Sequence, residues 1–458
     1  MSNWASIRLD EICSLVTDGT HHSPVNTPTG DFRYVTAKNI RPWGLDLSDI
    51  YYVNESVHRE IYTRCPVEYG DVLYIKDGVT TGIAAINTLR EEFSLLSSVA
   101  LLKPEKNYLN SAYLKHWLNS PLTKKTMTNG MTGTAIKRLV LKQIRAAEIP
   151  VAPYEEQRRI ADKLDTVLTR VDALNDRLAR ITPLLKRFRQ SVLAAATSGR
   201  LTEDWRQEND LPALSWKSIT EFREQTLLDL PNSWKWVEFS EIAGVKSDLR
   251  DPSKYQNEVH LAPNHIEPWS GRISGCQTIA DDAVKSPKNW FNAGQIVYSK
   301  IRPNLCKVAI PDFSGLCSAD MYPISTKLND DYLLLWMLGE RFTSWASNAE
   351  SRTVLPKINT KELGKIPVPV ASAGEQTEIV RRVEILFAYA DRLEARLQTA
   401  RSAADRLTPA LLAKAFRGEL VPQDPNDEPA TELLRRLREA RAAEAPVKKT
   451  RGRKAATA

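Results

Sequence analysis

The sequence predicts an α+β protein in which two mixed α/β domains are joined by two long helices that pair as an antiparallel coiled coil, with pseudo-twofold symmetry. An internal repeat is the first observation, because Glu156-Gln157 returns 219 residues later as Glu375-Gln376. After each copy, apolar residues follow a four-three spacing that is typical of a coiled-coil seam. Before each copy, short runs of Val, Ile and Tyr alternate with turn signals, which indicates strands of a mixed domain.

Length and composition are those of an ordinary globular protein. The 458 residues allow roughly three structural units. Hydrophobic residues make up 42% and charged residues 26%, with a mean hydropathy of -0.37, which excludes collagenous and disordered chains. No stretch approaches the roughly 18 apolar residues of a membrane helix, and residues 1–8 hold no apolar signal-peptide core. We therefore expect a cytoplasmic protein without a membrane partner.

Charge and cysteine content narrow the function class only slightly. The 63 Lys and Arg residues against 56 Asp and Glu give a net charge of +7 and a pI near 9.0. This mild excess fits a polyanion such as nucleic acid without requiring one. The five cysteines stand at scattered spacings without a C-x-x-C pair, so neither a disulfide framework nor a zinc knuckle is indicated.

The repeat divides the chain into six segments. Ile149-Pro150-Val151 and Ile366-Pro367-Val368 stand just before the two copies, so each copy follows a domain of its own. We expect a first domain over 1–150, a central helical spacer over 151–201, a polar linker over 202–231, a second domain over 232–369, a distal helical spacer over 370–420 and a flexible basic tail over 421–458.

Both domains are expected to combine short strands with a helix near their end. Asp18-Gly19 and Asp77-Gly78 are turn signals between predicted strands of the first domain. Helices are predicted over 111–125 and 330–344. The mixture favours α+β domains over doubly wound sheets.

Shorter anchors align the two domains more loosely. Residues 37–39 correspond to 262–264 in this alignment. Tryptophans also recur, as the pairs Trp43 and Trp269, and Trp117 and Trp336. Recurrence in both copies favours core packing of these rings over base stacking.

Each repeated segment is predicted to be one helix of about 40 residues, or roughly 60 Å. Pro183 and Pro409 fall inside the two helices, and because the heptad phase continues through both, we expect kinks rather than loops. A single heptad run would suit an oligomerising helix, but two equal runs in one chain favour pairing with each other. The predicted coiled-coil interface consists of Ile160, Leu164, Val167, Val171, Leu174, Leu178, Ile379, Val383, Leu386, Leu393 and Leu397.

Catalytic motifs for nucleic-acid chemistry are absent from the sequence. Gly364-Lys365 is followed by Ile, so no Walker A loop is present, and no G-x-G-x-x-G occurs. No Pro-Pro dipeptide occurs, which excludes the Asn/Asp-Pro-Pro-aromatic motif that holds a flipped base in amino-methyltransferases. Neither H-E-x-x-H nor H-x-E with C-x-x-C is present. We expect no catalytic residue, no metal site and no cofactor in this chain.

One histidine pair and two aspartates could suggest a metal site or catalysis. His21-His22 could hold a metal, but without a third ligand at a recognisable spacing a DNA-facing loop is favoured. Asp71 and Asp77 could suggest nuclease chemistry. Asp77 stands in an Asp-Gly turn and Gln295 replaces Asp71 in the second copy, so we interpret both as structural.

Binding is the remaining chemistry, and basic and amide residues gather on the predicted loops. Arg and Lys can read guanine edges, Asn can read adenine, and other cations neutralise phosphates. For any single residue, an ordinary solvated charge is the alternative. The candidate DNA-binding residues are Thr20, His21, Lys38, Asn39, Arg41, Lys76, Lys137, Arg138, Asn264, Lys300, Arg302, Asn304 and Lys357.

The chain resembles the specificity subunit of type I restriction–modification systems over nearly its whole length. The runs 156–165, 185–193, 201–206, 378–391 and 413–420 are closest to the type IA branch. The domains match only by sparse motifs, Asp18-Gly19-Thr20-His21 and Gly70-Asp71-Val72-Leu73. In this family the domains set the DNA target, so their divergence fits the resemblance.

The resemblance implies that each domain is a target recognition domain that reads one half of a bipartite, asymmetric DNA site. The paired helices would act as a ruler for the unread spacer. Two methyltransferase subunits with S-adenosylmethionine would methylate adenine in each half-site. Two restriction and translocase subunits with ATP and Mg²⁺ would translocate and cleave the DNA. The chain itself would carry no cofactor and no catalysis.

Other function classes stay open at this point. A self-contained nuclease would act on DNA as the purified chain, and a coiled-coil structural adaptor would bind partners without sequence preference. A specificity subunit of a related type II system with a fused nuclease and methyltransferase is a third alternative. Salt-dependent binding to one bipartite sequence separates a DNA reader from the first two classes.

Overall fold

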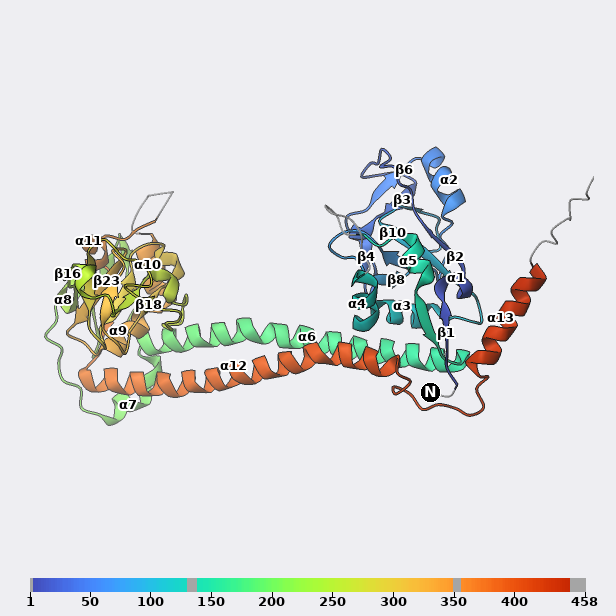
Figure 1. Ribbon diagram of the computed structural model, residues 1–458. Helices are drawn as coiled ribbons and strands as arrows, with labels where there is room; N and C mark the ends of the chain where they lie inside the picture. Colours follow the sequence, from blue (N-terminus) through green and yellow to red (C-terminus); the bar gives the residue numbers. More distant parts are fainter. Residues whose placement is uncertain (1–2, 130–137, 349–355, 445–458) are drawn as a thin grey trace, which may run out of the picture. The chain divides into compact units, whose positions relative to one another are not determined.

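The computed structural model describes residues 3–129, 138–348 and 356–444, and these form two compact units (Figure 1). Unit 1 combines Met1–Leu178 with Ala400–Ala458, and unit 2 is Ala179–Thr399. Each unit thus holds one mixed α/β domain and a part of both long helices. The domain, helix, domain, helix order predicted from the repeat is observed.

Unit 1 is built around a four-stranded antiparallel sheet with the order β2-β10-β7-β8, beside a three-stranded sheet β6-β3-β9 and the pairs β1-β11 and β4-β5. Val72, Tyr74, Ala100 and Leu102 of the main sheet are buried against the helices. The strands are β1 (Ala5–Arg8), β2 (Cys13–Asp18), β3 (Phe32–Val35), β4 (Ile40–Arg41), β5 (Gly44–Leu45), β6 (Tyr51–Val53), β7 (Val72–Ile75), β8 (Ala84–Ile86), β9 (Ser94–Leu95), β10 (Val99–Pro104) and β11 (Glu148–Val151). The helices of this domain are α1 (Leu9–Ile12), α2 (Glu55–Arg64), α3 (Ser111–Asn119), α4 (Pro121–Asn129) and α5 (Leu141–Ala146), with a short 3-10 helix η1 (Ala37–Asn39).

Unit 2 repeats this plan, with the four-stranded sheet β15-β23-β20-β21 and the pair β14-β24 in the matching places. Its second sheet is larger, with the order β16-β19-β22-β17-β18. The strands are β12 (Glu221–Phe222), β13 (Gln225–Thr226), β14 (Lys235–Glu238), β15 (Ala243–Val245), β16 (Leu249–Arg250), β17 (Val259–Leu261), β18 (Gln277–Thr278), β19 (Lys288–Phe291), β20 (Ile296–Ser299), β21 (Val308–Ala309), β22 (Gly315–Cys317), β23 (Met321–Thr326) and β24 (Pro367–Val370). The helices are α7 (Glu203–Glu208), α8 (Phe239–Ile242), α9 (Asp330–Met337), α10 (Glu340–Ser347) and α11 (Thr360–Gly364), with 3-10 helices η2 (Arg200–Thr202), η3 (Pro252–Lys254), η4 (Pro263–His265) and η5 (Pro303–Leu305).

The helices predicted near the end of each domain are each two helices. Pro121 starts α4 after a break at Ser120, and α10 starts after Gly339, since Pro and Gly interrupt a continuous helix. The N-cap Asn110 accepts a hydrogen bond from the Tyr113 amide at 3.0 Å, and the hydroxyl of Tyr113 donates to the Pro150 carbonyl at 2.7 Å. Unit 2 has the same bonds, at Asn329, Tyr332 and Pro369.

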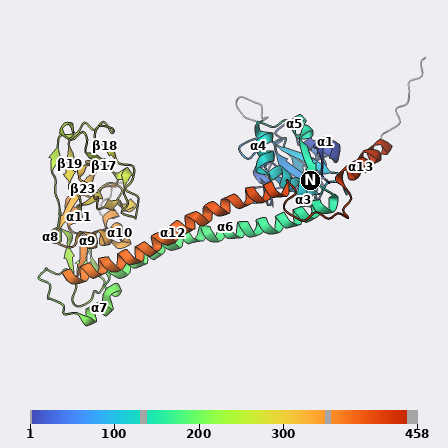
Figure 2. The ribbon, with the colours of Figure 1, turned by 60° about the horizontal axis from the view of Figure 1, so that its bottom comes forward.

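The long helices α6 (Tyr154–Thr197) and α12 (Ala373–Ala415) begin 219 residues apart, as the repeat predicts. Both continue through their prolines, Pro183 and Pro409, without a loop. In unit 1 the first part of α6 packs with the last part of α12. In unit 2 the last part of α6 packs with the first part of α12. The two helices are therefore antiparallel in each unit (Figure 2).

Most residues of the predicted seam are buried or half-buried, whereas Leu174 is 41% exposed. The α-helix has 3.6 residues per turn, so a strict heptad pattern drifts away from a straight contact line. Ile160, Leu164, Val171, Leu178, Ile379, Val383 and Leu397 are buried, whereas Val167, Leu386 and Leu393 are half-buried. Ile160 and Leu164 also belong to the core of the first domain rather than to the helix pair alone.

The predicted flexible tail is wrong for residues 430–444, which form helix α13 (Ala430–Glu444). Leu433, Leu434 and Leu437 are buried in the core of unit 1, at 1%, 3% and 1% exposure. Arg441 adds a hydrogen bond from Nη2 to the Cys13 carbonyl at 2.8 Å. The apolar stripe stands three and four residues apart, which is the spacing of an amphipathic helix. The basic run 448–454 lies outside the described residues.

The segment 202–231, predicted as a polar linker, is partly folded onto unit 2. Thr202 is buried, and its hydroxyl donates to the Glu375 carboxylate at 2.7 Å. Arg382 binds Asp204 of α7 at 2.7 Å. These contacts tie the segment after α6 to the start of α12.

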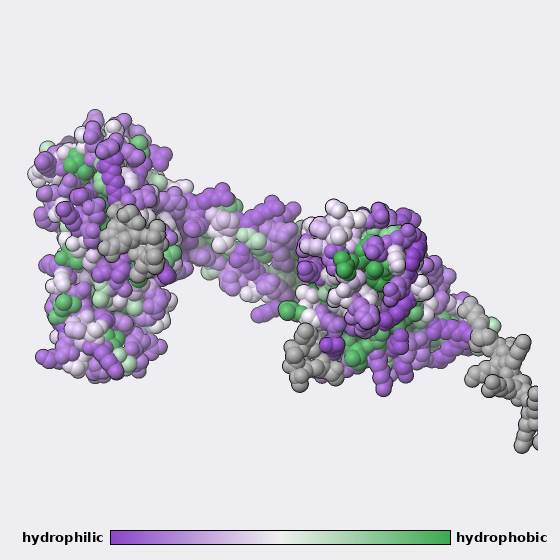
Figure 3. Space-filling view, turned by 90° about the horizontal axis from the view of Figure 1, so that it is seen from above, coloured by the Kyte–Doolittle hydropathy of each residue, from purple (hydrophilic) through white to green (hydrophobic). Residues whose placement is uncertain are grey.

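Within the described ranges, no helix is long and apolar enough to cross a membrane. The same residues contain no group of three or more His, Cys, Asp or Glu side chains that could hold a metal ion. Figure 3 shows that hydrophilic residues cover most of the face seen there, with hydrophobic residues in small separate groups.

Candidate nucleic-acid interface

Strands β2 and β7 both pair with β10, and this brings Asp18 and Lys76 to the same edge of the sheet. Gly19 follows Asp18 at a close approach, because a Cβ there would lie 1.9 Å from the Leu95 carbonyl oxygen. The Thr20 amide then donates to the same carbonyl at 2.9 Å. The glycine of the Asp18-Gly19-Thr20-His21 motif is therefore required because any side chain at this position would clash with the backbone at Leu95.

The Asp18 carboxylate is the centre of a cluster of charged side chains in unit 1, here called the Asp18 cluster. Arg64 Nη2 donates to Asp18 Oδ1 at 2.5 Å, and Lys76 Nζ lies 3.4 Å from Oδ2. His21 Nε2 lies 3.3 Å from Oδ1, and Asp77 binds Lys76 at 3.2 Å. Asp18 and Lys76 are buried, whereas Arg64 and His21 are about half exposed. Lys76 is thus an internal ion-pair partner rather than the free cation that the sequence predicts.

A second loop of unit 1 carries Lys38, Asn39 and Arg41. Lys38 is exposed, but Asn39 is buried and its amide bonds the backbone at Thr36, Asp46 and Asp49. The hydrogen-bonding groups of Asn39 are therefore used inside the loop, in contrast to the free amide that the prediction of DNA reading assumes. Arg41 bonds the Lys38 carbonyl at 2.6 Å and lies 3.3 Å from Asp46.

A groove separates this loop from the turn that follows β7. Its walls include Lys38, Arg41, Asp49, Asp77 and Val79. Val79 is fully exposed at the tip of the turn. Arg138, which pairs with Asp77 in an isolated bridge, is also exposed, and Lys137 lies outside the described residues.

The predicted residues of unit 2 gather around the end of β20. Asn304 is exposed on η5, and its N-cap residue Arg302 is also exposed, with a backbone φ of 49°. Lys300 lies over the Tyr322 ring at 5.3 Å, and Lys357 lies 3.6 Å from Asp320.

Lys307, which is not among the residues predicted from the sequence, joins this group to Asn264. Its Nζ donates to the Pro263 carbonyl at 2.6 Å, next to the exposed Asn264 on η4. Burial lowers the pKa of Lys307, and the charge of Arg302 lowers it further. Five of the predicted side chains, Lys300, Arg302, Asn304, Lys357 and Asn264, thus lie on connected loops of one unit.

Matched backbone bonds give the true alignment of the two units. The Leu139 amide donates to Lys76, as Ile358 donates to Lys300, so Lys76 corresponds to Lys300. The 3-10 helices η1 and η4 occupy the same place in the two units, so residues 37–39 correspond to residues 263–265. The sequence alignment predicts 262–264, which is one residue earlier. Asn39 then corresponds to His265, whose ring accepts from the Ala262 amide at 3.1 Å.

The tryptophan prediction is wrong for Trp43, which is 73% exposed in the turn between β4 and β5. Trp117 and Trp336 are buried, at 6% and 2% exposure. Trp269 packs partly against the core of unit 2 and lies 5.7 Å from Lys186 Nζ. The same residue type is thus part of the core in one place and exposed in another.

Arg64 is the second cation that the sequence reasoning missed. It ends helix α2, with no basic residue next to it in the sequence. Only the fold brings it to Asp18, 46 residues earlier in the chain.

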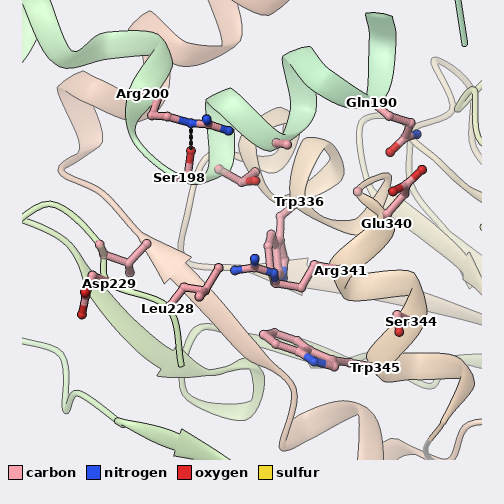
Figure 4. A pocket seen from close by; sticks show the side chains of 14 residues that line it. Gln190, Ser198, Arg200, Leu228, Asp229, Trp336, Glu340, Arg341, Ser344 and Trp345 are labelled. Atoms are coloured by element: carbon pink, nitrogen blue, oxygen red, sulfur yellow. Dashed lines mark hydrogen bonds between the residues drawn. The ribbon is translucent and has the colours of Figure 1, made fainter. Parts of the chain in front are cut away.

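A separate cavity of unit 2 lies where α6 ends against α9 and α10 (Figure 4). Trp336, Trp345, Arg341 and Gln190 line it, and Gln190 donates to the Leu338 carbonyl at 3.4 Å. It contains none of the predicted DNA-binding residues. This cavity therefore belongs to the packing of the domain on α6.

The chain is similar to known DNA specificity proteins. Residues 1–182 and 231–400 match the family described as type I restriction modification DNA specificity domain. The chain is 47% identical over 347 residues to the type I restriction enzyme EcoDI specificity subunit of Escherichia coli, covering 73% of this chain and 78% of that protein. It is 28% identical over 445 residues to the EcoKI specificity subunit of Escherichia coli strain K12, covering 91% and 90%.

Two solved structures share the fold. The HsdS subunit from Thermoanaerobacter tengcongensis aligns with a TM-score of 0.57 and 17% identity, covering 91% of this chain and 97% of that chain. A chain from a structure of complex assembly and conformational transition of the type I R-M system aligns with a TM-score of 0.62 and 16% identity, covering 92% and 99%. Since the family match extends through both units, the chain belongs to the family of type I restriction–modification DNA specificity subunits.

Proposed function

We propose that this specificity subunit reads a bipartite, asymmetric DNA target, one half with each unit. The observation that supports this best is one shared sheet order with different side-chain arrangements at matched loop positions. Lys76 is buried between Asp18 and Asp77, whereas its counterpart Lys300 lies over Tyr322. One scaffold with two different loop surfaces is what two half-sites of different sequence require.

Catalysis is assigned to partner subunits in this proposal. Two methyltransferase subunits with S-adenosylmethionine would methylate adenine in the half-sites, and two restriction and translocase subunits would use ATP and Mg²⁺ to translocate and cleave DNA. The support is the lack of phosphate-binding and base-flipping motifs in the sequence. The complex would act in the cytoplasm, where the genome is accessible.

The long helices would set the unread spacer between the two half-sites. Along the chain, α6 and α12 each contribute residues to both units. Two domains that read one face of B-DNA are expected about 34–36 Å apart, which is one helical turn. The runs 156–165 and 413–420 support assignment to the type IA-like branch.

The test is a base-resolution map of adenine methylation in the host genome, with and without this gene. We expect one bipartite motif to lose methylation on both strands when the gene is deleted. Complementation with the intact gene should restore the same motif. A map that stays unchanged while the methyltransferase partner is expressed would contradict the proposal.

A further inference from the structure

In unit 2 the loop between β17 and β18 reaches the long helices. Arg272 Nη2 on this loop donates to Glu394 Oε2 of α12 at 3.3 Å and lies 3.6 Å from Asp391 Oδ1. The centre of the Trp269 ring on the same loop lies 5.7 Å from Lys186 Nζ of α6. One loop of the domain therefore contacts both long helices.

The two carboxylates that receive Arg272 are also held from the helix side. Arg189 of α6 binds both Asp391 and Glu394 through Nη2, at 3.0 Å to Glu394 Oε2, and its side chain is only 17% exposed. Burial opposes the charged form of Glu394, but the hydrogen bond from Arg189 and the charge of Arg272 outweigh it and hold the pKa of Glu394 below its ordinary value. Arg272 thus joins a network of several charges, which stabilises more than an isolated surface pair does.

Arg272 contacts α12 far from the point where the domain joins this helix. The joint is the hydrogen bond from Trp234 to Glu375 in the first turn of α12, at 2.8 Å. Apolar packing of the domain on α12 extends to Phe387. Glu394 stands 19 residues after Glu375, which is about 28 Å along an α-helix. A tilt of about 10° about the joint would therefore open the Arg272 contact by about 5 Å and break it.

Unit 1 uses the corresponding hairpin differently. The hairpin is closed by the ends of 40–45 in unit 1 and by the ends of 266–273 in unit 2, so it is two residues shorter in unit 1. Arg41 of the shorter hairpin lies 3.3 Å from Asp46 beside it. Trp43 at its tip is 73% exposed. The longer hairpin, which carries Arg272 to α12, is thus a feature of the second domain.

We propose that Arg272 is a positioning residue, which fixes the tilt of the second domain on the helix pair and thereby determines how strictly the subunit selects the spacer length of its DNA target. This inference rests on the proposed function. One extra base pair in the spacer moves one half-site by about 3.4 Å and turns it by about 35° relative to the other. A domain with a fixed tilt cannot follow this displacement, whereas a domain released from Glu394 follows it in part.

The experiment uses the full chain assembled with its modification subunits. Selection from a duplex library, randomised in sequence and in spacer length, first defines the target of the wild-type complex. Affinities are then measured for the preferred spacer and for spacers one base pair shorter and longer. Arg272→Ala should reduce the ratio of these affinities at least about fivefold. Arg272→Glu should reduce it further, because it places an acid beside Asp391 and Glu394. The preferred bases of both half-sites should stay the same.

A charge exchange and a matched control complete the set. Arg272→Glu combined with Glu394→Arg restores an ion pair across the same contact and should recover most of the spacer selection. Lys365→Ala is the control, because Lys365 is also 52% exposed and pairs with Glu362 inside the domain. It should leave the spacer selection unchanged. A ratio of affinities at one salt concentration removes the phosphate contribution that all spacers share.

Unchanged spacer selection in both single Arg272 variants would overturn the proposal. An altered base preference in either half-site would also overturn it, since Arg272 would then contact the DNA itself. A double variant that selects spacers no better than Arg272→Glu alone would assign the effect to something other than the pair with Glu394, and would count against the proposal in the same way. A wild-type complex without any sequence preference would instead reject the proposed function.

Discussion

The indole of Trp234 donates a hydrogen bond to the fully buried Glu375 carboxylate, at 2.8 Å from Nε1 to Oε2. In unit 1, Trp4 makes the matching bond to Glu156 at 3.1 Å. The residues just before β1 and β14 are thus tied to the first turn of the helix that follows each domain. The repeated Glu of the Glu-Gln pair therefore has a structural role.

The repeated glutamine acts in the same way. Gln157 Oε1 accepts from the Asn110 amide and Nε2 donates to the Ala152 carbonyl, both at 2.9 Å. Gln376 makes the equivalent bonds to Asn329 and Ala371, also at 2.9 Å. The strongest sequence repeat therefore marks the joint between domain and helix, and not a contact with DNA.

Glu375→Gln should destabilise unit 2 by about 3 kcal/mol. The change removes the charge that Arg206 pairs with, and a buried ion pair broken on one side leaves an uncompensated partner. Urea denaturation followed by amide exchange of residues 232–241 and 373–383 measures the effect. Glu384→Gln, at an exposed position of the same helix, is the control and should change stability by less than about 0.5 kcal/mol. Equal effects of the two changes would contradict the assigned role.

Leu434→Ala should destabilise unit 1 by about 2–4 kcal/mol, because Leu434 is 3% exposed in the core that α13 completes. Leu122→Ala in the same unit removes a 76% exposed side chain and should cost less than about 0.5 kcal/mol. Denaturation monitored by amide exchange in β1 and α1 compares the two. A Leu434→Ala protein as stable as the wild type would exclude α13 from the core.

Exchanging residues 1–150 for the equivalent domain of another subunit should change one half-site only. The exchange is expected to succeed best when residues 421–444 are exchanged together with it, since α13 packs on that domain. Two chimaeras are compared, one with residues 1–150 exchanged and one with residues 421–444 exchanged as well. Adenine methylation mapping gives the target motif of each chimaera and the fraction of its sites that are methylated. A change in both half-sites would contradict the modular reading of DNA.

Acidification should destabilise unit 1 in two steps. Burial lowers the pKa of His116, so its neutral form is favoured in the folded state and stability is lost as the pH falls below about 6.5. The hydrogen bond from His116, followed by the Lys115 contacts, lowers the pKa of Asp165 to about 2. Because this folded pKa is depressed, its contribution is present above about pH 4 and is lost between about pH 4 and pH 2.

Asp165→Asn tests the second step, because it removes the loss between about pH 4 and pH 2 while leaving the burial of His116. His116→Asn should flatten the first step. Unfolding free energies measured from pH 7 to pH 2.5 compare the variants with the wild type. A wild-type profile that is flat over this range would contradict both assignments.

Inserting one heptad into each long helix should lengthen the preferred spacer by about three base pairs, since seven helical residues add about 10.5 Å. Matched sites are the bonds between Leu178 and Ala179 in α6 and between Thr399 and Ala400 in α12, where the two units divide. Arg401 Nη2 donates to the Leu178 carbonyl at 3.0 Å, so the sites face each other. A heptad in α6 alone is the control and should disrupt the pairing. An unchanged spacer length in the double insertion would contradict the proposal that the two helices set the spacer.

Local and repeated patterns in the sequence determined the architecture of this protein. The 219-residue offset and the four-three apolar spacing predict α6 and α12 because a helix depends on neighbours three and four residues away. The sequence also predicted exposed loop positions at Arg302 and Asn304, and both side chains are exposed. These patterns act within a few residues, so they are readable before folding.

Only the tertiary structure decided how single side chains are used. Asn39 is buried in its own loop, Trp43 is exposed, and Leu434 joins a core more than 400 residues away in the chain from Ile12. Arg64 meets Asp18 because β2 and the end of α2 converge at one sheet edge. Burial and ion pairing depend on what the fold brings alongside each residue, and no periodicity in the chain records that.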